Sequence, residues 1–420
     1  MATGVAGGML AEGVRQLAQG KRPKISDLLL TPANAIRVTQ QLAQLRGAAM
    51  KVGQLISMDT GDMLPPELAQ ILARLRSDAQ PMPKKQLMSV LDASWGPGWQ
   101  AKFKTFSFVP LAAASIGQVH RAQRVDAHGQ AQELAIKIQY PGVRESINSD
   151  VDNVASLLRM TGLLPRTLDL APLLRQAKTQ LHDEADYLRE GSYLQRYATL
   201  LADSPEFLVP ELHADLTTPS VLAMSFVSGV AVETMVNAPQ DERNRIVSLP
   251  MGLLFRELFE FQLIQTDSNF ANYRYNTDTH QLVLLDFGAT RPLKTAMARG
   301  FRRLVKAAAA GDAETMRKAA LGLGYFADDT QEKHQRAVLE LFDIALEPLR
   351  FDGDYDFAES TMPAQLRDAG IALGLDRDFW HIPPIDTLLL HRKLGGLFLL
   401  AARLRAQVNV RALMQNHLRS

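Results

Sequence analysis

The chain has 420 residues, enough for two or three compact parts that each bury a core. Hydrophobic residues make up 46% of it and charged residues 22%, the ordinary balance of a globular protein. The formal net charge is only +1, so the charge indicates no nucleic-acid partner, and the lack of cysteine excludes disulfides, thiol catalysis and cysteine-bound zinc.

Residues 1–25 are rich in glycine and then in lysine and arginine. They fit a basic amphipathic helix, which either docks on the protein itself or lies on a membrane surface. No stretch approaches the roughly 20 apolar residues of a membrane span, and no secretory signal is evident. We therefore expect a cytoplasmic protein without a transmembrane span, whose contact with the inner membrane, where it exists, is peripheral.

Apolar residues recur at helical spacing over residues 33–58 and predict a helix. Inside it lies Gly53, and a glycine within a helix costs about 1 kcal/mol relative to alanine, which indicates a packing reason. Lys51 and Gln54 flank this glycine and share one helical face. The alternative is a solvated lysine and glutamine beside a helix crossing. Residues 1–100 as a whole predict a helical N-terminal extension.

From residue 106 the pattern changes to strands. A small-residue loop between two strands is predicted at Ala112, Ala113, Ala114, Ser115, Ile116, Gly117 and Gln118. Because alanine disfavours positive φ, this loop is expected to be stiffer than a glycine-rich one. A plain β-hairpin is the alternative. Lys137 lies on the next predicted strand, twenty residues after Gly117.

A helical insert is expected near 141–170, followed by one long helix over 171–201. The long helix carries three carboxylates on nearby turns, namely Glu184, Asp186 and Glu190. Their alternative interpretation is a solvated acidic face.

Residues 221–227 predict a strand that includes Met224, and the chain then reaches Gly229, where a hinge to a second lobe is expected. Helices are predicted from residue 241 up to a stretch rich in polar residues at 265–290.

That stretch holds three polar residues whose spacing indicates a functional site. Asp267 is followed five residues later by Asn272, and Asp286 follows an apolar strand and precedes Phe-Gly. Phosphoryl transfer uses one carboxylate to orient the proton of the attacking group, and an amide with a second carboxylate to hold Mg²⁺. The alternative is a β-hairpin with an ordinary acidic residue at its end.

This spacing is that of the catalytic and metal loops of protein kinases, and Lys137 matches their strand lysine, which grips the nucleotide phosphates. Kinases also need one glutamate on a following helix to pair with that lysine. They usually carry His-Arg before the catalytic Asp, whereas this chain has Gln265-Thr266. The departure concerns the substrate side of the site and leaves the metal side unchanged.

Behind Asp286 the sequence predicts helices up to the C-terminus. The run 387–420 carries six Arg or Lys and no Asp or Glu. A helix docked on the protein is the plain expectation, and contact with anionic lipid is the alternative.

Together these motifs resemble the UbiB/ADCK (AarF-type) family of atypical kinases, near its coenzyme Q branch. The resemblance implies an α+β, bilobal, protein-kinase-like fold with a small β-rich N-lobe, a helical C-lobe and the helical extension. The expected boundaries are 1–100 for the extension, 101–229 for the N-lobe with its insert, and 230–420 for the C-lobe.

The resemblance also implies roles for residues. Lys137 would pair with Glu190, Asp267 would be the catalytic carboxylate, and Asn272 and Asp286 would bind Mg²⁺. The residues assigned to the nucleotide, ATP or ADP, are Ala112, Ala113, Ala114, Ser115, Ile116, Gly117, Gln118, Lys137 and Met224. Those assigned to covering the place of a peptide substrate are Lys51, Gln54, Glu184 and Asp186.

The implied activity is hydrolysis of ATP, or phosphorylation of a small acceptor, in support of ubiquinone biosynthesis. The implied partners are a quinone-precursor lipid and other quinone-biosynthesis proteins. One alternative is a nucleotide-gated scaffold that does not catalyse. Another is a phosphotransferase of the aminoglycoside-kinase type, which shares the core but needs no helix with the Lys-Val-Gly-Gln sequence.

Overall fold

The computed structural model describes residues 45, 47–49, 51–52, 81–126, 128–161, 171–267, 269–375, 381 and 383–418. The chain divides into two compact units, one of Met1–Arg189 with His213–Met224 and the other of Glu190–Leu212 with Ser225–Ser420. Neither unit is a single contiguous segment, because the chain leaves the first unit, returns to it for one strand and leaves again. Gln54 and most of the predicted helix over 33–58 lie outside the described residues.

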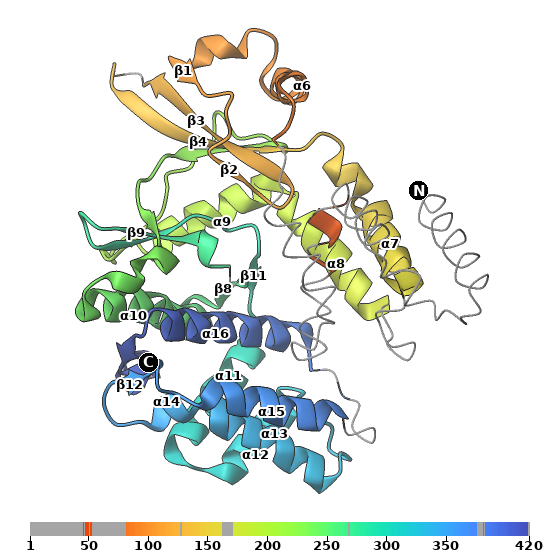
Figure 1. Cartoon of the computed structure of the whole chain (residues 1–420), viewed down its shortest axis with the longest axis vertical. Helices are drawn as coiled ribbons and strands as arrows, with labels where there is room; N and C mark the ends of the chain where they lie inside the picture. Colours follow the sequence, from red (N-terminus) through yellow and green to blue (C-terminus); the bar gives the residue numbers. More distant parts are fainter. Residues whose placement is uncertain are drawn as a thin grey trace, which may run out of the picture. The chain divides into compact units, whose positions relative to one another are not determined.

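The first unit is built on a five-stranded sheet (Figure 1). Its strands are β1 (Thr105–Phe106), β2 (Ala112–Ala113), β3 (Gly117–Val125), β4 (Ala131–Gln139) and β6 (Val221–Ser225). They run in the order β1-β3-β4-β6, and β2 also pairs with β3. The long strands β3 and β4 pair antiparallel, from Gly117 opposite Gln139 to Val125 opposite Ala131. This register places Lys137 opposite Val119 at the centre of the sheet.

The alanine-rich stretch forms the expected tight connection between two strands. Ala112 and Ala113 pair with Val119 and Gln118, and the Ala114 N–H donates to the Gly117 carbonyl at 2.9 Å. Gly117 is required because a Cβ there would lie 2.2 Å from the carbonyl oxygen of Ile138. The glycine therefore lets β3 start directly against β4.

One face of this sheet is covered by α6 (Lys84–Trp95) and the short 3₁₀ helix η1 (Trp99–Lys102). Leu87 and Leu91 are one helical turn apart, so both point to the same side. They pack with Trp99 against apolar residues of the sheet, among them Leu134, Ile136 and Ile138. Full burial of such a side chain contributes roughly 1.5–3 kcal/mol, so this layer is a main source of stability for the unit.

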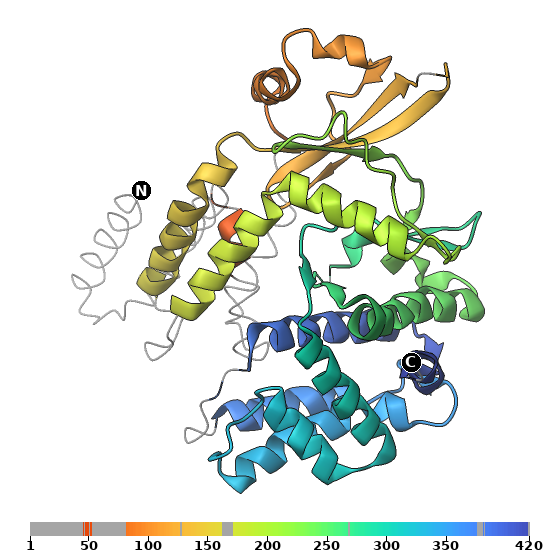
Figure 2. The same ribbon diagram turned by 180° about the vertical axis from the view of Figure 1, so that it is seen from behind.

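Three helices follow the sheet: α7 (Val143–Thr161), α8 (Ala171–Glu184) and α9 (Tyr187–Leu200). In both Figure 1 and Figure 2, α7 and α8 run side by side. The expectation of one helix over 171–201 is wrong, since the chain breaks at Ala185 and Asp186. The Asp186 carboxylate accepts the Arg189 N–H at 3.0 Å and so caps the start of α9.

The described residues of the second unit form three small sheets. The strands are β5 (Phe207–Leu208), β7 (Val230–Ala231), β8 (Leu263–Gln265), β9 (Tyr273–Asn276), β10 (Gln281–Leu284), β11 (Thr290–Pro292), β12 (Tyr355–Asp356) and β13 (Gln407–Val408). Four of them form a sheet in the order β5-β10-β9-β7, in which β9 and β10 make a hairpin. The other pairs are β8 with β11 and β12 with β13.

Helices make up most of this unit. They are η2 (Val232–Asn237), α10 (Gln240–Arg256), the π-helix η3 (Glu257–Phe261), η4 (Phe270–Asn272), α11 (Thr295–Ala310), α12 (Ala313–Gly322), α13 (Glu332–Ala345), α14 (Glu347–Arg350), α15 (Met362–Leu375), α16 (Ile385–Arg403) and α17 (Val410–Leu418). α16 lies beside α10 (Figure 2), so the expectation of a docked helix is confirmed there. The basic run nevertheless breaks after α16, where Arg405 has a φ of 51°. Of the helices the structure describes, none has the length and apolar character needed to cross a bilayer.

His120 is buried on β3 and belongs to a continuous series of hydrogen bonds. Its Nδ1 donates to the Ser107 carbonyl at 2.7 Å, and its Nε2 accepts from Gln118 Nε2 at 2.8 Å. Gln118 Oε1 in turn accepts the Met82 N–H at 2.8 Å. Burial lowers the pKa of His120, and the hydrogen bond to Ser107 opposes that change only in part.

We predict that the first unit loses stability as the pH falls below 6.5, the ordinary pKa of histidine. The folded state holds His120 neutral, so the unfolded state takes up more protons in this range and is favoured. Urea unfolding measured at neutral and acidic pH checks this. His120→Leu is expected to reduce the pH dependence, whereas His128→Leu, at an exposed site, leaves it unchanged. Equal pH dependence in both variants would contradict the assignment.

Candidate functional site

The loop between β8 and β9 carries Asp267 and Asn272, and hydrogen bonds fix both side chains. Asn272 Nδ2 donates to Asp267 Oδ2 at 3.0 Å, and the Asn269 N–H donates to Asp267 Oδ1 at 3.2 Å. Asn269 also caps η4, whose last residue is Asn272. Because the amide nitrogen of Asn272 is bound to Asp267, its Oδ1 is the atom available to a cation.

Asp286 follows β10, and its carboxylate and that of Glu190 both lie close to Gly288. The Gly288 N–H donates to Asp286 Oδ1 at 2.9 Å. A Cβ added at Gly288 would lie 3.3 Å from Glu190 Oε2 and 3.4 Å from Asp286 Oδ1, so glycine lets the two carboxylates approach the same point. Glu190 is only 1% exposed. The second unit thus contains four predicted site residues, which are Glu190, Asp267, Asn272 and Asp286.

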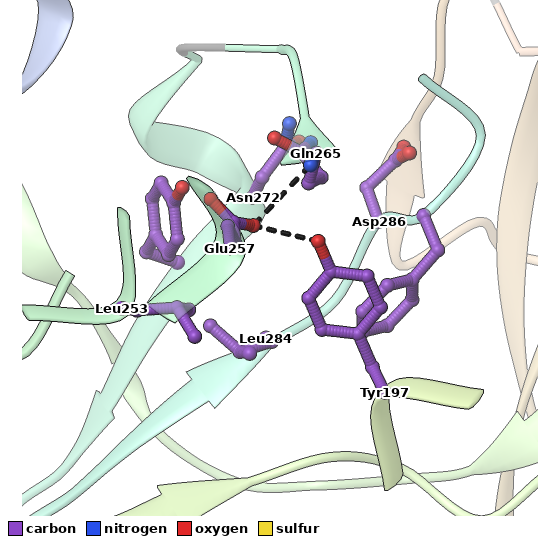
Figure 3. Close-up of a pocket in the computed structure, with 9 residues that line it drawn as sticks. Tyr197, Leu253, Glu257, Gln265, Asn272, Leu284 and Asp286 are labelled. Atoms are coloured by element: carbon purple, nitrogen blue, oxygen red, sulfur yellow. Dashed lines mark hydrogen bonds between the residues drawn. The ribbon is translucent and has the colours of Figure 1, made fainter. Parts of the chain in front are cut away.

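The two predicted metal ligands, Asn272 and Asp286, line the same small cavity (Figure 3). Its volume is about 10 Å³, enough for one water molecule. Asn272 and Asp286 line it together with Gln265, whose side chain lies next to that of Asn272 in Figure 3. Gln265 is 6% exposed, and its amide finds no hydrogen-bond partner among the described residues. Sequence reasoning noticed Gln265 only as a departure from kinases and missed this buried amide.

The donor set fits Mg²⁺. This cation prefers oxygen ligands and takes one or two from the protein, while phosphates and water supply the others. Asn272 and Asp286 carry side-chain oxygens and line one cavity. Among the described residues no cluster of three or more His, Cys, Asp or Glu is arranged to hold a metal by itself.

Glu257 lines the same cavity as Asn272 and Asp286, and the sequence analysis did not single it out. It opens the π-helix η3 and is 0% exposed. Tyr197 donates to Glu257 Oε1 at 2.6 Å, the Gln265 N–H donates to the same oxygen at 3.2 Å, and Lys393 on α16 forms an ion pair with Oε2. Burial lowers the pKa of Lys393, and the Glu257 carboxylate opposes that change. Burial and the Glu257 charge both raise the pKa of Tyr197 well above its usual value.

Arg392, the residue before Lys393, reaches the predicted catalytic carboxylate. Its Nη2 lies 3.2 Å from Asp267 Oδ1. Two of the six cations in the basic run are therefore turned inward toward acids of the site. The adjacent Arg and Lys in a run without acids were the only sequence signal for this pair.

The first unit holds the remaining predicted residues. Lys137 on β4 is 8% exposed, and its ammonium lies 5.2 Å from the centre of the Tyr187 ring. Met224 on β6 is 5% exposed. Glu190 belongs to the other unit, so its pairing with Lys137 stays a prediction.

Lys51 and Glu184, two of the residues assigned to covering the place of a peptide substrate, meet at the alanine-rich hairpin. Lys51 forms an ion pair with Glu184 Oε1, and the Ser115 hydroxyl donates to Glu184 Oε2 at 3.2 Å. Nearby, a Cβ on Gly47 would lie 3.2 Å from the Ser115 carbonyl oxygen, so the backbone at Gly47 lies directly against the hairpin. Asp186 instead caps α9, and Gln118 uses its amide on Met82 and His120.

Comparison with known proteins gives consistent matches. The ABC1 atypical kinase-like domain matches residues 74–320. Atypical kinase COQ8, mitochondrial, of Saccharomyces cerevisiae is 37% identical over 97% of this chain and 81% of its own length. Atypical kinase COQ8B, mitochondrial, of Rattus norvegicus is 38% identical over 99% of this chain and 78% of its own length.

A solved structure is similar in fold. The Mycobacterium tuberculosis protein Rv3197, determined as a complex with erythromycin, superposes with a TM-score of 0.63 at 23% identity. The match covers 90% of this chain and 93% of that one. Together with the domain match, it confirms the predicted kinase-like fold.

We predict that Lys393→Met lowers the free energy of unfolding by about 3–5 kcal/mol, because it leaves Glu257 charged, buried and unpaired. The double variant Lys393→Met/Glu257→Gln is expected to recover most of that loss. The glutamine oxygen still accepts from Tyr197 and from the Gln265 N–H, and no charge is left. Urea denaturation of the three proteins measures the difference, and a double variant as unstable as the single one would contradict the prediction.

Proposed function

The chain belongs to the ABC1 atypical kinase-like family, and from this premise we propose that it binds ATP with Mg²⁺ and either hydrolyses it or phosphorylates a small acceptor. The observation that carries the proposal is the joint placement of Asp267, Asn272 and Asp286. A hydrogen bond to Asp267 orients the side chain of Asn272, and Asn272 and Asp286 line the same cavity. Phosphoryl transfer depends mainly on such positioning and on electrostatic stabilisation.

In this proposal Asn272 and Asp286 hold Mg²⁺ through their side-chain oxygens. The chemistry that Mg²⁺ supplies when bound is neutralisation of the charge on the phosphates. Asp267 accepts the proton of the attacking water or hydroxyl, and Arg392 holds that carboxylate in position. Gln265, which stands where kinases usually carry His, contributes a buried amide to the same cavity.

For the first unit we propose that Lys137 binds the phosphates of ATP or ADP and that Glu190 orients it. The hairpin of Ala112–Gln118 covers the phosphates, and Met224 lines the adenine site. The Glu184 carboxylate forms an ion pair with Lys51 and accepts from Ser115, and so links Lys51 to that hairpin. These contacts support a site that is closed to peptide substrates. Gln54 helps to close it. The contacts also favour the proposal over an aminoglycoside-kinase type, which has no use for an N-terminal extension.

The relatives named COQ8 support a role in the coenzyme Q pathway. We propose that the chain acts with other quinone-biosynthesis proteins on or near a quinone-precursor lipid. The relatives are named mitochondrial, and for this chain we propose a peripheral contact with the inner membrane.

We expect purified wild-type protein to hydrolyse ATP when Mg²⁺ is present and Asp286→Asn to be slower by roughly 100-fold or more, because a ligand of the charge-neutralising cation is lost. Asp278→Asn, at an exposed turn, is the matched control and keeps the wild-type rate. Phosphate release measures turnover, and ATP binding is measured in parallel. Binding without any turnover above that of Asp286→Asn would reject the enzyme and favour the nucleotide-gated scaffold.

The pathway assignment predicts that a strain without the gene accumulates quinone precursors and contains less quinone. Wild-type protein restores the quinone, and Asp286→Asn does not if turnover is needed. Mass spectrometry of lipid extracts measures both pools. An unchanged quinone content in the deletion strain would remove the pathway assignment while leaving the ATPase result untouched.

A further inference from the structure

The second unit contains an apolar cavity that the proposed reaction does not use. Its volume is about 100 Å³, and of its eighteen lining residues sixteen are apolar. The two polar ones are Tyr325 and His391, and among the residues that the structure describes no acid, lysine or arginine lines the space. A cavity with such walls stays dry and accepts apolar guests, whereas a charged ligand would lose its hydration without gaining a partner.

The two polar residues form a pair at one place on the wall. The Tyr325 hydroxyl lies 2.5 Å from His391 Nε2, and their rings are stacked with centres 5.3 Å apart. Tyr325 is 5% exposed, whereas His391 is exposed. A ligand with one hydroxyl or ether oxygen can hydrogen-bond here while its hydrocarbon part fills the interior.

The cavity shares the helix α16 with the site. Leu390, Leu394 and Phe398 follow one another at intervals of four residues and line the cavity. Arg392 and Lys393 project from another face of the same turns to Asp267 and Glu257. A shift of α16 against the cavity therefore moves both cations relative to their carboxylates.

A second wall is shared in the same way. Phe255 and Leu258 line the cavity, and Glu257 lies between them in sequence, at the start of the π-helix. π-helical turns are frequent at functional sites, since they place neighbouring side chains on unusual faces. Two elements thus carry cavity-lining residues and ion-pair residues side by side.

We propose that this cavity binds an uncharged aliphatic group of roughly four to six carbon atoms, judged from a cavity of about 150 Å³ that takes benzene. The group belongs to a small alcohol or to the end of a lipid chain. Its binding is coupled to Asp267 through α16. The binding does not depend on the proposed function, whereas the importance of the coupling rests on Asp267 being the catalytic carboxylate.

The binding is tested with 3-methylbutan-1-ol as the probe and glycerol as the polar control, by titration calorimetry and thermal unfolding. We expect the probe to bind and to raise the unfolding temperature, and glycerol at the same concentration not to do so. Ala345→Leu fills the cavity from α13 and is expected to weaken binding by at least about tenfold. Ala337→Leu makes the same change in the same helix away from the cavity and keeps the wild-type affinity.

Val305→Met fills the space from α11 and serves as a second variant if Ala345→Leu does not fold. Lack of probe binding to the wild type, or equal binding by the filled and control variants, overturns the proposal. Decan-1-ol distinguishes the two sources of the aliphatic group. Saturable binding that is lost in Ala345→Leu indicates a lipid chain end, and binding of the short alcohol alone indicates a small molecule.

The coupling is tested without any measurement of turnover, so its failure differs from failure of the proposed enzyme. Amide hydrogen exchange is followed with and without 3-methylbutan-1-ol. We expect slower exchange in α16 and also in residues 263–272, and neither change in Ala345→Leu. Slower exchange in α16 alone, with residues 263–272 unchanged, overturns the coupling to Asp267.

Discussion

Two adjacent cations on α16 hold the polar centre of the second unit in place. Arg392 contacts Asp267, and Lys393 contacts Glu257, so one helical turn neutralises a carboxylate on the β8–β9 loop and another in the π-helix. Glu257 also accepts the Gln265 N–H, which fixes the end of β8. Because a buried charge that loses its partner is costly, the helix, the π-helix and the loop keep their positions together.

The local parts of this arrangement follow from short sequence patterns. The spacing of Asp267, Asn272 and Asp286 identified the polar loop, and the small residues before Gly117 identified the hairpin. The resemblance grouped Lys51 with Glu184 as residues that cover the site, and an ion pair joins the two. The first two patterns each lie in one short stretch of sequence. The third rests on the family resemblance, which groups motifs that are distant in sequence.

The parts that escaped prediction depend on contacts between distant residues. Arg392 and Asp267 are 125 positions apart, and Lys393 and Glu257 are 136 apart, so no local pattern links them. The charge of the basic run suggested lipid as an alternative, because a sequence does not reveal which cations turn inward. Asp186 misled in the opposite way. It was expected to lie inside one continuous helix, whereas its carboxylate accepts the Arg189 N–H and caps the start of α9.

The first unit receives one of its strands late in the chain. β4 lies between β3 and β6, yet residues 190–212 of the other unit are made before β6 exists. During synthesis one backbone edge of this largely buried strand therefore stays unpaired until residue 225 has left the ribosome. Unpaired strand edges recruit other chains and promote aggregation. The growing protein is consequently exposed to aggregation from the emergence of β4 until β6, which ends 86 residues later, has also emerged.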